Sequence, residues 1–221
     1  LEGAKNLCDY RVRSLPAAKK HSREMNTAGA RYPWMAALDG SEQCETWDIG
    51  CSELHITADI AYALDAYCKK SGDEAFYLDK AAEVYVETAR FWVSRYTFRP
   101  ETGEADLLFC KGTDEYCGIT NNNLFTNVMV QHDLTLAIQA AVDLQEKRPE
   151  RYHDLGITPQ EVEQMNTLRQ AIKWPRDPVT GRLRQDETLH LLEPVSTEQL
   201  QPDAGAGYHH VGFDRRPRDK A

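Results

Sequence analysis

The segment KGTDEYCGITNNNLFTN, residues 111–127, holds two adjacent carboxylates and three consecutive asparagines just before an apolar helical pattern. Successive side chains in a loop diverge, so we expect one of Asp114 and Glu115 to do chemistry and the other to position a group. The ring of Tyr116 can desolvate the neighbouring carboxyl and raise its pKa, which suits general-acid work. Asparagines offer the donors and acceptors that sugar hydroxyls need. A second interpretation stays open: a polar turn whose asparagines cap the following helix.

Two further segments carry side chains suited to sugar binding. In GARYPWMAALDGSE, residues 29–42, Trp34 lies in a non-helical stretch and could stack on a pyranose ring, or equally fill the core between helices. In ELHITADIAYA, residues 53–63, His55 and Thr57 open a predicted helix. A lone histidine there is more often a cap or a packed group than a ligand. None of these segments decides the function alone.

The elements that must position these residues are helical almost throughout. Apolar residues recur at helical spacing and predict five helices, over residues 14–25, 53–70, 73–96, 123–145 and 158–174. One strand is predicted over residues 105–110. Paired long helices joined by short turns are typical of an all-α array of helical hairpins.

Capping residues and apolar stripes refine these helices. Ser14 and Thr158 are predicted N-caps, while Gly72 ends one helix and Asp73 caps the next. The helix after the asparagines is predicted to bury one stripe, formed by Leu124, Val128, Leu134, Ala137, Ala141 and Leu144.

Composition limits the classes of protein that fit. A chain of 221 residues predicts one domain, and its net charge of −9 argues against a nucleic-acid or anionic-membrane partner. No apolar run approaches the roughly 20 residues of a membrane helix, and no secretion leader is visible. Residues 196–221 are polar and aperiodic, which predicts a disordered tail in which His209 and His210 are weak metal candidates.

The six cysteines include two pairs with the same spacing, Cys44 with Cys51 and Cys110 with Cys117. Zinc sites usually use closer pairs, and six cysteines are too dilute for a disulfide scaffold. We therefore predict buried free thiols, no metal site and a cytoplasmic protein.

From about Tyr10 to Val195, the chain resembles the central part of glycoside hydrolase family 65. Four segments carry the resemblance, in this order: GARYPW, HITADIAYA, ETARFWVSR and GTDEYCGITNNNLFTN. That family comprises maltose, kojibiose, nigerose and trehalose phosphorylases and acid trehalases. The resemblance implies that residues 1–195 form part of an (α/α)6 barrel, incomplete at its C-terminal side. The segment 196–221 resembles nothing in the family.

The resemblance also implies the chemistry. The family's G-P-D-E-Y motif falls on residues 112–116, which makes Glu115 the general acid of an inverting phosphorylase. Inorganic phosphate, the co-substrate, would attack an α-glucosyl disaccharide from the opposite face and give β-glucose 1-phosphate, with no other cofactor. Asp114 would position a group. Three residues, Trp34, His55 and Thr57, would lie near the glucosyl subsite.

Departures from the family keep two alternatives open. Thr113 stands where Pro is usual, Cys117 where His is common, and Met35 where several members carry Glu. The chain begins with Leu1, and about five helices cannot close a twelve-helix ring, so we expect a cut-down piece that recruits a partner copy or is poorly stable. The alternatives are an acid-trehalase-like hydrolase, whose base has no candidate here, and an inactive fragment acting as an interaction module.

Overall fold

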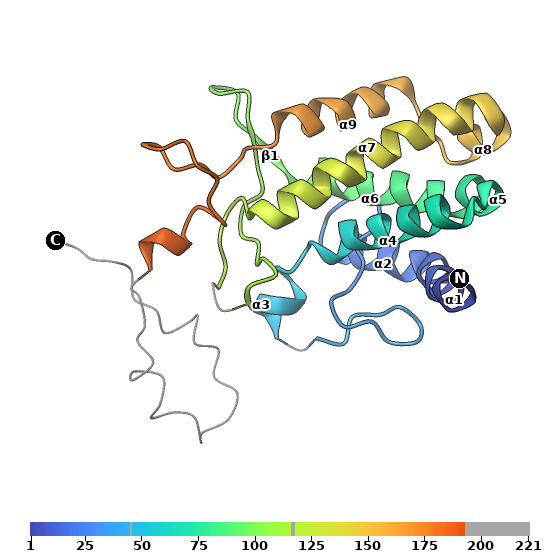
Figure 1. Cartoon of the computed structure of the whole chain (residues 1–221), viewed down its shortest axis with the longest axis horizontal. Helices are drawn as coiled ribbons and strands as arrows, with labels where there is room; N and C mark the ends of the chain where they lie inside the picture. The colour runs from blue at the N-terminus through green and yellow to red at the C-terminus, as the bar shows by residue number, and fades with distance from the viewer. Residues whose placement is uncertain (45, 116–117, 193–221) are drawn as a thin grey trace, which may run out of the picture.

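The chain folds into a body of long helices with irregular segments gathered at one end (Figure 1). This computed structural model describes residues 1–44, 46–115 and 118–192. The helices are α1 (Glu2–Arg13), α2 (Leu15–Glu24), α3 (Trp47–Gly50), α4 (Ile56–Ser71), α5 (Glu74–Phe76), α6 (Ala82–Arg95), α7 (Leu124–Lys147), α8 (Pro149–Asp154) and α9 (Pro159–Ala171), with a π-helical turn η1 (Tyr77–Ala81) and a 3₁₀ turn η3 (Leu189–Leu191). The mostly helical fold agrees with the predicted all-α class.

Helix α6 lies at the centre of the body, packed against α2, α4, α7 and α9. It follows α5 and η1 without a break, so the helix predicted over residues 73–96 is confirmed, with a π-helical turn inside it. Neighbours on several sides bury more of α6 than one stripe. The apolar residues that recur at helical spacing between residues 73 and 96 are all buried: Leu78, Ala82, Tyr85, Ala89, Trp92 and Tyr96.

Helix boundaries follow the predicted caps, with one exception. The side chains of Asp73 and Thr158 each accept the backbone N–H three residues further on, at 2.9 and 3.2 Å. Gly72 ends α4 with φ of 66°, a left-handed conformation that glycine adopts without strain. Ser14 is the N-cap residue of α2, as predicted, but its side chain makes no capping bond and its hydroxyl donates to the carbonyl of Tyr10 at 2.8 Å.

Three further predictions need correction. Helix α1 was not predicted, because the segment that forms it is polar and buries only Cys8. Of the strand predicted over residues 105–110, only β2 (Ala105–Asp106) forms, paired antiparallel with β1 (Thr97–Phe98). Helix α7 contacts α4, α6 and α9, and this packing buries Val130 while leaving Val128 exposed.

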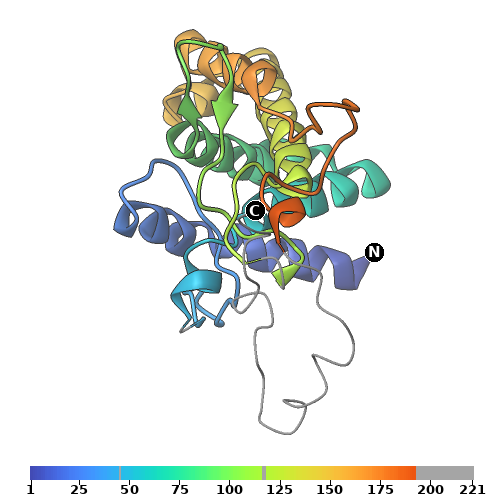
Figure 2. The ribbon, with the colours of Figure 1, turned by 90° about the vertical axis from the view of Figure 1, so that its left-hand side faces the viewer.

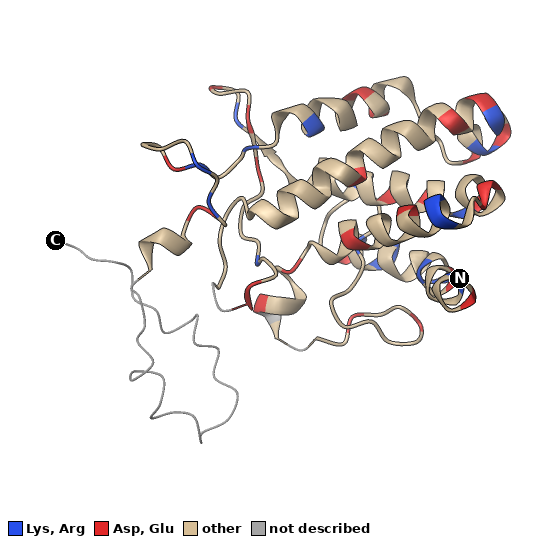
Figure 3. Ribbon diagram, viewed as in Figure 1, with Lys and Arg blue, Asp and Glu red and all other residues tan. Residues whose placement is uncertain are grey.

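The irregular end gathers three segments that lie far apart in the sequence, residues 26–55, 96–123 and 172–192 (Figures 1 and 2). Isolated β-bridges join the second segment to each of the other two. Acidic and basic residues are interspersed along the helices (Figure 3). Within the described residues, no helix has the length and apolar character needed to cross a membrane.

Candidate active site

The three consecutive asparagines hold backbone segments together at the irregular end of the molecule. Asn121 and Asn122 each accept a backbone N–H from the segment 107–109, at 2.9 and 2.8 Å. Asn122 has φ of 51°, which asparagine tolerates better than most residues. Asn123 caps α7 by accepting the N–H of Thr126 at 3.1 Å. For the asparagines, the interpretation as a turn and helix cap is therefore confirmed.

Glu115 lies half-buried in a loop whose two ends are tied together. Cys110 and Thr120 exchange backbone hydrogen bonds of 2.9 and 2.8 Å, which close the loop. The N–H of Lys111 donates to the carbonyl of Ser52 at 2.9 Å and anchors the loop to the segment before α4. The loop that bears Glu115 is therefore fixed at its base.

Gly112 packs directly against the cap of α7. A Cβ atom at this position would meet the amide nitrogen of the Asn123 side chain at 2.1 Å, far closer than non-bonded atoms approach. Only glycine fits unless the Asn123 side chain moves. The motif glycine therefore couples the position of the loop to the start of α7.

Asp114 is also half-buried and accepts a hydrogen bond from Nε2 of Gln185 at 3.2 Å. The carbonyl of Gln185 in turn accepts the N–H of Leu124 at 2.8 Å, at the start of α7. Asp114 thus links the loop to the 172–192 segment, in keeping with a positioning role. Tyr116 and Cys117, on which two sequence arguments rested, lie outside the described residues.

The imidazole of His55 lies between two aromatic rings. Its centroid is 6.1 Å from the ring of Trp34 and 5.5 Å from the ring of Phe125, both edge-to-face. Nδ1 lies 2.7 Å from a carboxylate oxygen of Asp59, a contact that orients the ring. His55 is only 5% exposed, and Nε2 has no hydrogen-bond partner in the part of the chain that the structure describes.

The structure therefore brings together Trp34 and His55, as the resemblance implied, and adds a residue that the sequence reasoning missed. Trp34 is half-buried and packs against the core, which fits its packing interpretation, while its stacking on a sugar stays a prediction. Phe125 is 42% exposed at the start of α7. In the sequence, the signal for Phe125 was an aromatic residue close after the asparagines that cap the helix.

The backbone around Trp34 is held by two further residues. The buried hydroxyl of Thr57 accepts the N–H of Tyr32 at 3.1 Å, so Thr57 fixes the backbone just before Trp34. The carboxylate of Glu42 accepts four backbone N–H groups, those of Trp34 and Met35 at 2.7 and 3.0 Å among them. Sequence reasoning missed Glu42, which follows the predicted Asp-Gly turn.

Glu53 is a second carboxyl at this end of the molecule, and it is completely buried. Neither of its carboxyl oxygens has a hydrogen-bond partner among the described residues. Burial, with the charge of Glu115 as the next cause, raises the pKa of Glu53 to about 8, and Lys111 partly offsets this rise. Lys111 is itself buried, with its ammonium 3.1 Å from a carboxylate oxygen of Asp48.

The model of the glycosyl hydrolase family 65 central catalytic domain matches residues 2–213. This chain belongs to glycoside hydrolase family 65. Kojibiose phosphorylase of Thermoanaerobacter brockii is 34% identical over 191 residues, which are 80% of this chain and 25% of the relative. The α,α-trehalose phosphorylase of Geobacillus stearothermophilus is 34% identical over 85% of this chain and 25% of its own.

Other family 65 relatives extend the comparison. The 1,2-α-glucosylglycerol phosphorylase of Bacillus selenitireducens is 29% identical over 88% of this chain and 27% of its own. The structure of a putative kojibiose phosphorylase from the human microbiome superimposes with a TM-score of 0.83 at 21% identity, over 94% of this chain and 31% of that one, which shows a shared fold. The chain spans about a quarter of the length of the curated relatives it matches.

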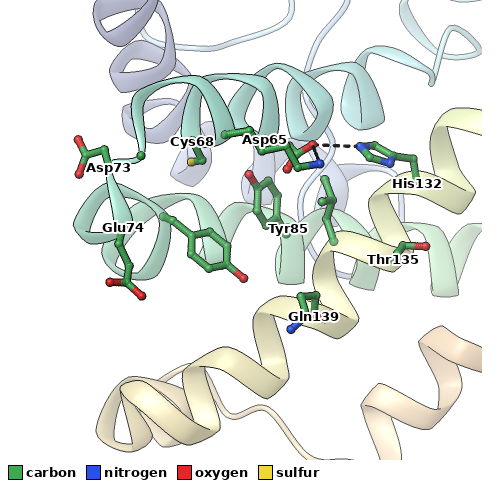
Figure 4. A pocket seen from close by; sticks show the side chains of 12 residues that line it. Asp65, Cys68, Asp73, Glu74, Tyr85, His132, Thr135 and Gln139 are labelled. Atoms are coloured by element: carbon green, nitrogen blue, oxygen red, sulfur yellow. Dashed lines mark hydrogen bonds and ion pairs between the residues drawn. The ribbon is translucent and has the colours of Figure 1, made fainter.

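Away from these family motifs, a pocket of about 670 Å³ opens between α4, η1, α6 and α7 (Figure 4). Tyr85 and His132 line it, and Nε2 of His132 lies 3.6 Å from a carboxylate oxygen of Asp65. None of the residues predicted for the site lines this pocket.

The described cysteines are free thiols, as predicted. Cys8 and Cys110 are buried, but Cys51 is exposed and Cys44 and Cys68 are partly exposed, so the prediction that all are buried was wrong for these three. Cys44 and Cys51 lie before and after the short α3, at the irregular end, and Cys68 lies on α4. Over residues 1–44, 46–115 and 118–192, no group of three or more His, Cys, Asp or Glu residues could hold a metal ion. His209 and His210 lie outside the described residues.

Proposed function

We propose that this chain is the acid-bearing part of an inverting glycoside phosphorylase that acts on an α-glucosyl disaccharide. The observation that carries the proposal is the 34% identity to a kojibiose phosphorylase over 80% of this chain. The products would be β-glucose 1-phosphate and the released sugar.

Glu115 would act as the general acid. Its half-exposed position on an anchored loop allows its carboxyl to reach a bound sugar. It would protonate the glycosidic oxygen as the bond from that oxygen to the anomeric carbon breaks, while a phosphate oxygen bonds to the same carbon from the opposite face. Phosphate is the nucleophile, so no carboxylate base is needed. The groups that seat phosphate are expected in later helices of the barrel, as the resemblance implies.

The glucosyl unit would lie against Trp34, His55 and Phe125. Two aromatic rings offer apolar surface to a pyranose ring, and Nε2 of His55 offers an acceptor to one of its hydroxyls. Thr57 would act through the backbone it supports, and Asp114 through Gln185. A cytoplasmic location would suit this reaction, because a phosphorylated sugar is retained in the cell.

Burial of Glu53 weighs against the hydrolase alternative. An inverting hydrolase needs a second carboxylate that activates water on the far side of the sugar. Glu53 is coupled to Glu115 by charge, but it is 0% exposed and cannot reach a solvent water. Glu53 is therefore excluded as that base, and the proposal of phosphorolysis rests on the phosphorylase relatives.

The test is release of β-glucose 1-phosphate from kojibiose, trehalose, maltose and nigerose in the presence of phosphate. We expect Glu115→Gln to lower the rate about a thousandfold, because a positioned general acid contributes roughly 10²–10⁴. Glu101→Gln, on the exposed turn between β1 and β2, is the matched control and should retain the wild-type rate. An active Glu115→Gln variant rules out the assigned acid. A folded wild type that releases glucose but no β-glucose 1-phosphate supports the hydrolase alternative, and one that releases neither supports the inactive fragment.

A further inference from the structure

Glu42 lies in a short hairpin, residues 35–43, that follows Trp34 directly and has no role in the mechanism proposed above. Ala36 and Glu42 form an antiparallel bridge between the two arms of the hairpin. Gly40 lies in the turn with φ of 84°, a conformation that glycine adopts without strain. The returning arm therefore places Glu42 beside the backbone that leads out of the tryptophan.

The carboxylate of Glu42 divides its hydrogen bonds unequally between its two oxygens. Oε2 accepts the N–H of Trp34 at 2.7 Å. Oε1 accepts the N–H groups of Met35, Gln43 and Cys44 at 3.0, 3.1 and 2.9 Å. A carboxylate has about four lone-pair sites, and hydrogen bonds to an ionised acceptor are roughly twice as strong as neutral ones. One of the two oxygens thus serves Trp34 alone.

The backbone before Trp34 is fixed separately, from helix α4. The hydroxyl of Thr57 accepts the N–H of Tyr32 at 3.1 Å. The ring of Trp34 lies edge-to-face against that of His55, immediately before α4, with the centroids 6.1 Å apart. Glu42 is the group that fixes the tryptophan from the side of the hairpin. Loss of its bond would therefore loosen the ring beside His55 while the bond between Thr57 and Tyr32 stays intact.

We propose that Glu42 is a positioning residue of the sugar site, whose carboxylate holds Trp34 where its ring stacks on the glucosyl unit. The proposal rests on the proposed function and deepens it. Glu42 acts through the backbone of Trp34 and does not touch the sugar. The competing interpretation is that Glu42 only closes the hairpin, in which case the affinity for sugar does not depend on it.

The first measurement is hydrogen exchange of backbone N–H groups by NMR in wild type and Glu42→Gln, which needs neither sugar nor turnover. Glutamine has the size of glutamate, but its NH2 group cannot accept a hydrogen bond. The orientation that keeps the three bonds of Oε1 turns this NH2 group towards the N–H of Trp34. That N–H should then exchange about tenfold faster, while the N–H of Tyr32 keeps its rate. Unchanged exchange at Trp34 would overturn the proposal.

The second measurement is the affinity for kojibiose and maltose, by isothermal titration calorimetry. A stacking ring contributes about fivefold in affinity, and a ring that is held less firmly loses part of this, so Glu42→Gln should weaken binding about threefold. The matched control is Asp39→Asn in the turn of the same hairpin, where Asp39 accepts the N–H and hydroxyl of Ser41 at 3.0 and 2.7 Å. This control should retain the wild-type affinity. Equal affinities of wild type and Glu42→Gln would leave Glu42 with closure of the hairpin only.

The double variant Glu42→Gln/Trp34→Ala tests whether Glu42 acts through the ring of Trp34. If it does, the substitution of Glu42 changes nothing once the ring is gone, so the double variant should bind sugar as Trp34→Ala does. A further loss equal to that of Glu42→Gln alone would show that the two residues act independently, which contradicts the proposal. Glu42→Asp keeps the charge but withdraws both oxygens, and it gives the same test if Glu42→Gln does not fold.

Two outcomes separate this proposal from the proposed function. Release of β-glucose 1-phosphate together with an unchanged affinity of Glu42→Gln would retain the proposed function and overturn only the role of Glu42. Absence of sugar binding to the folded wild type would overturn the glucosyl site and this role together, whereas the exchange data would still decide whether Glu42 holds Trp34.

Discussion

Two buried carboxyls, one in the helical body and one at the irregular end, are treated differently by the fold. Asp133 on α7 is fully buried, with one oxygen 2.9 Å from the hydroxyl of Thr88 and the other 2.9 Å from Nε1 of Trp92. Glu53 is equally buried and has no such partner among the described residues. Burial raises the pKa of both groups. The fold therefore satisfies the carboxyl of Asp133, while it leaves that of Glu53 without a partner among the described residues.

The neighbours of Asp133 show how a neutral acid is accommodated. The hydroxyl of Thr88 lies 2.9 Å from the carboxyl of Asp133 and also 2.9 Å from the carbonyl of Val84. A hydroxyl has one proton to donate. If that proton goes to Val84, a protonated Asp133 can donate to Thr88 and accept from Trp92, so that every group is satisfied. We therefore assign Asp133 a role in the stability of the body.

The largest effect on stability is expected from Asp133→Ala. It leaves Nε1 of Trp92 without its acceptor, removes a partner of Thr88 and opens a small cavity, which together should lower the free energy of unfolding by about 3 kcal/mol. Asp133→Asn keeps both hydrogen bonds and should cost less than about 1 kcal/mol near pH 4. Urea unfolding measures both. An Asp133→Ala variant as stable as wild type would mean that these bonds contribute nothing to the body.

The pH dependence of the stability of Asp133→Asn tests the same role of Asp133. The pKa of Asp133 is raised well above its ordinary value of 3.8 by burial, so the protonated form stabilises the fold fully below pH 3.8. That contribution is lost as pH rises through the raised value. Asparagine cannot ionise, so the stability of Asp133→Asn relative to wild type should increase as pH rises above about 4. Unfolding curves at several pH values check the sign, and a decrease with pH would contradict it.

The helical body follows from local rules that the sequence displays. The periodicity of residues 73–96 and the caps Asp73 and Thr158 are set by neighbours within a few positions. The packing of α7 is different, because contacts with three helices decide whether Val128 or Val130 is buried. Such contacts are not encoded in a window of sequence.

The residues of the site also divide into those that the sequence predicted and those that it did not. The family motifs indicated that Trp34 and His55 lie together, and their rings are in contact. Phe125 joins them only because α7 begins next to α4, and Glu53 gains its significance only because a loop some sixty positions later packs on it. Hydrogen bonds and charges between distant segments therefore account for what the sequence did not predict.

A smaller effect is expected from two tryptophans, one from each region. Trp34→Ala should weaken binding of maltose or kojibiose about fivefold, since a stacking ring contributes roughly 1 kcal/mol. Trp92→Phe loses the bond to Asp133 and should lower stability without changing the affinity for sugar. Isothermal titration calorimetry and urea unfolding separate the two effects. Unchanged affinity with lower stability for Trp34→Ala would make Trp34 a core residue only.

The smallest effect comes from two helix caps that are chemically alike. Thr158→Ala at the start of α9 and Asn123→Ala at the start of α7 should each lower the free energy of unfolding by about 1 kcal/mol, because each loses one capping bond. Only Asn123 packs against Gly112, so only Asn123→Ala should also lower the rate of phosphorolysis by loosening the loop of Glu115. Asn123→Asp retains an acceptor for the cap and is the control for stability. If Thr158→Ala lowers the rate as much as Asn123→Ala, stability of the body and placement of the acid are coupled, and the two regions cannot be treated as separate.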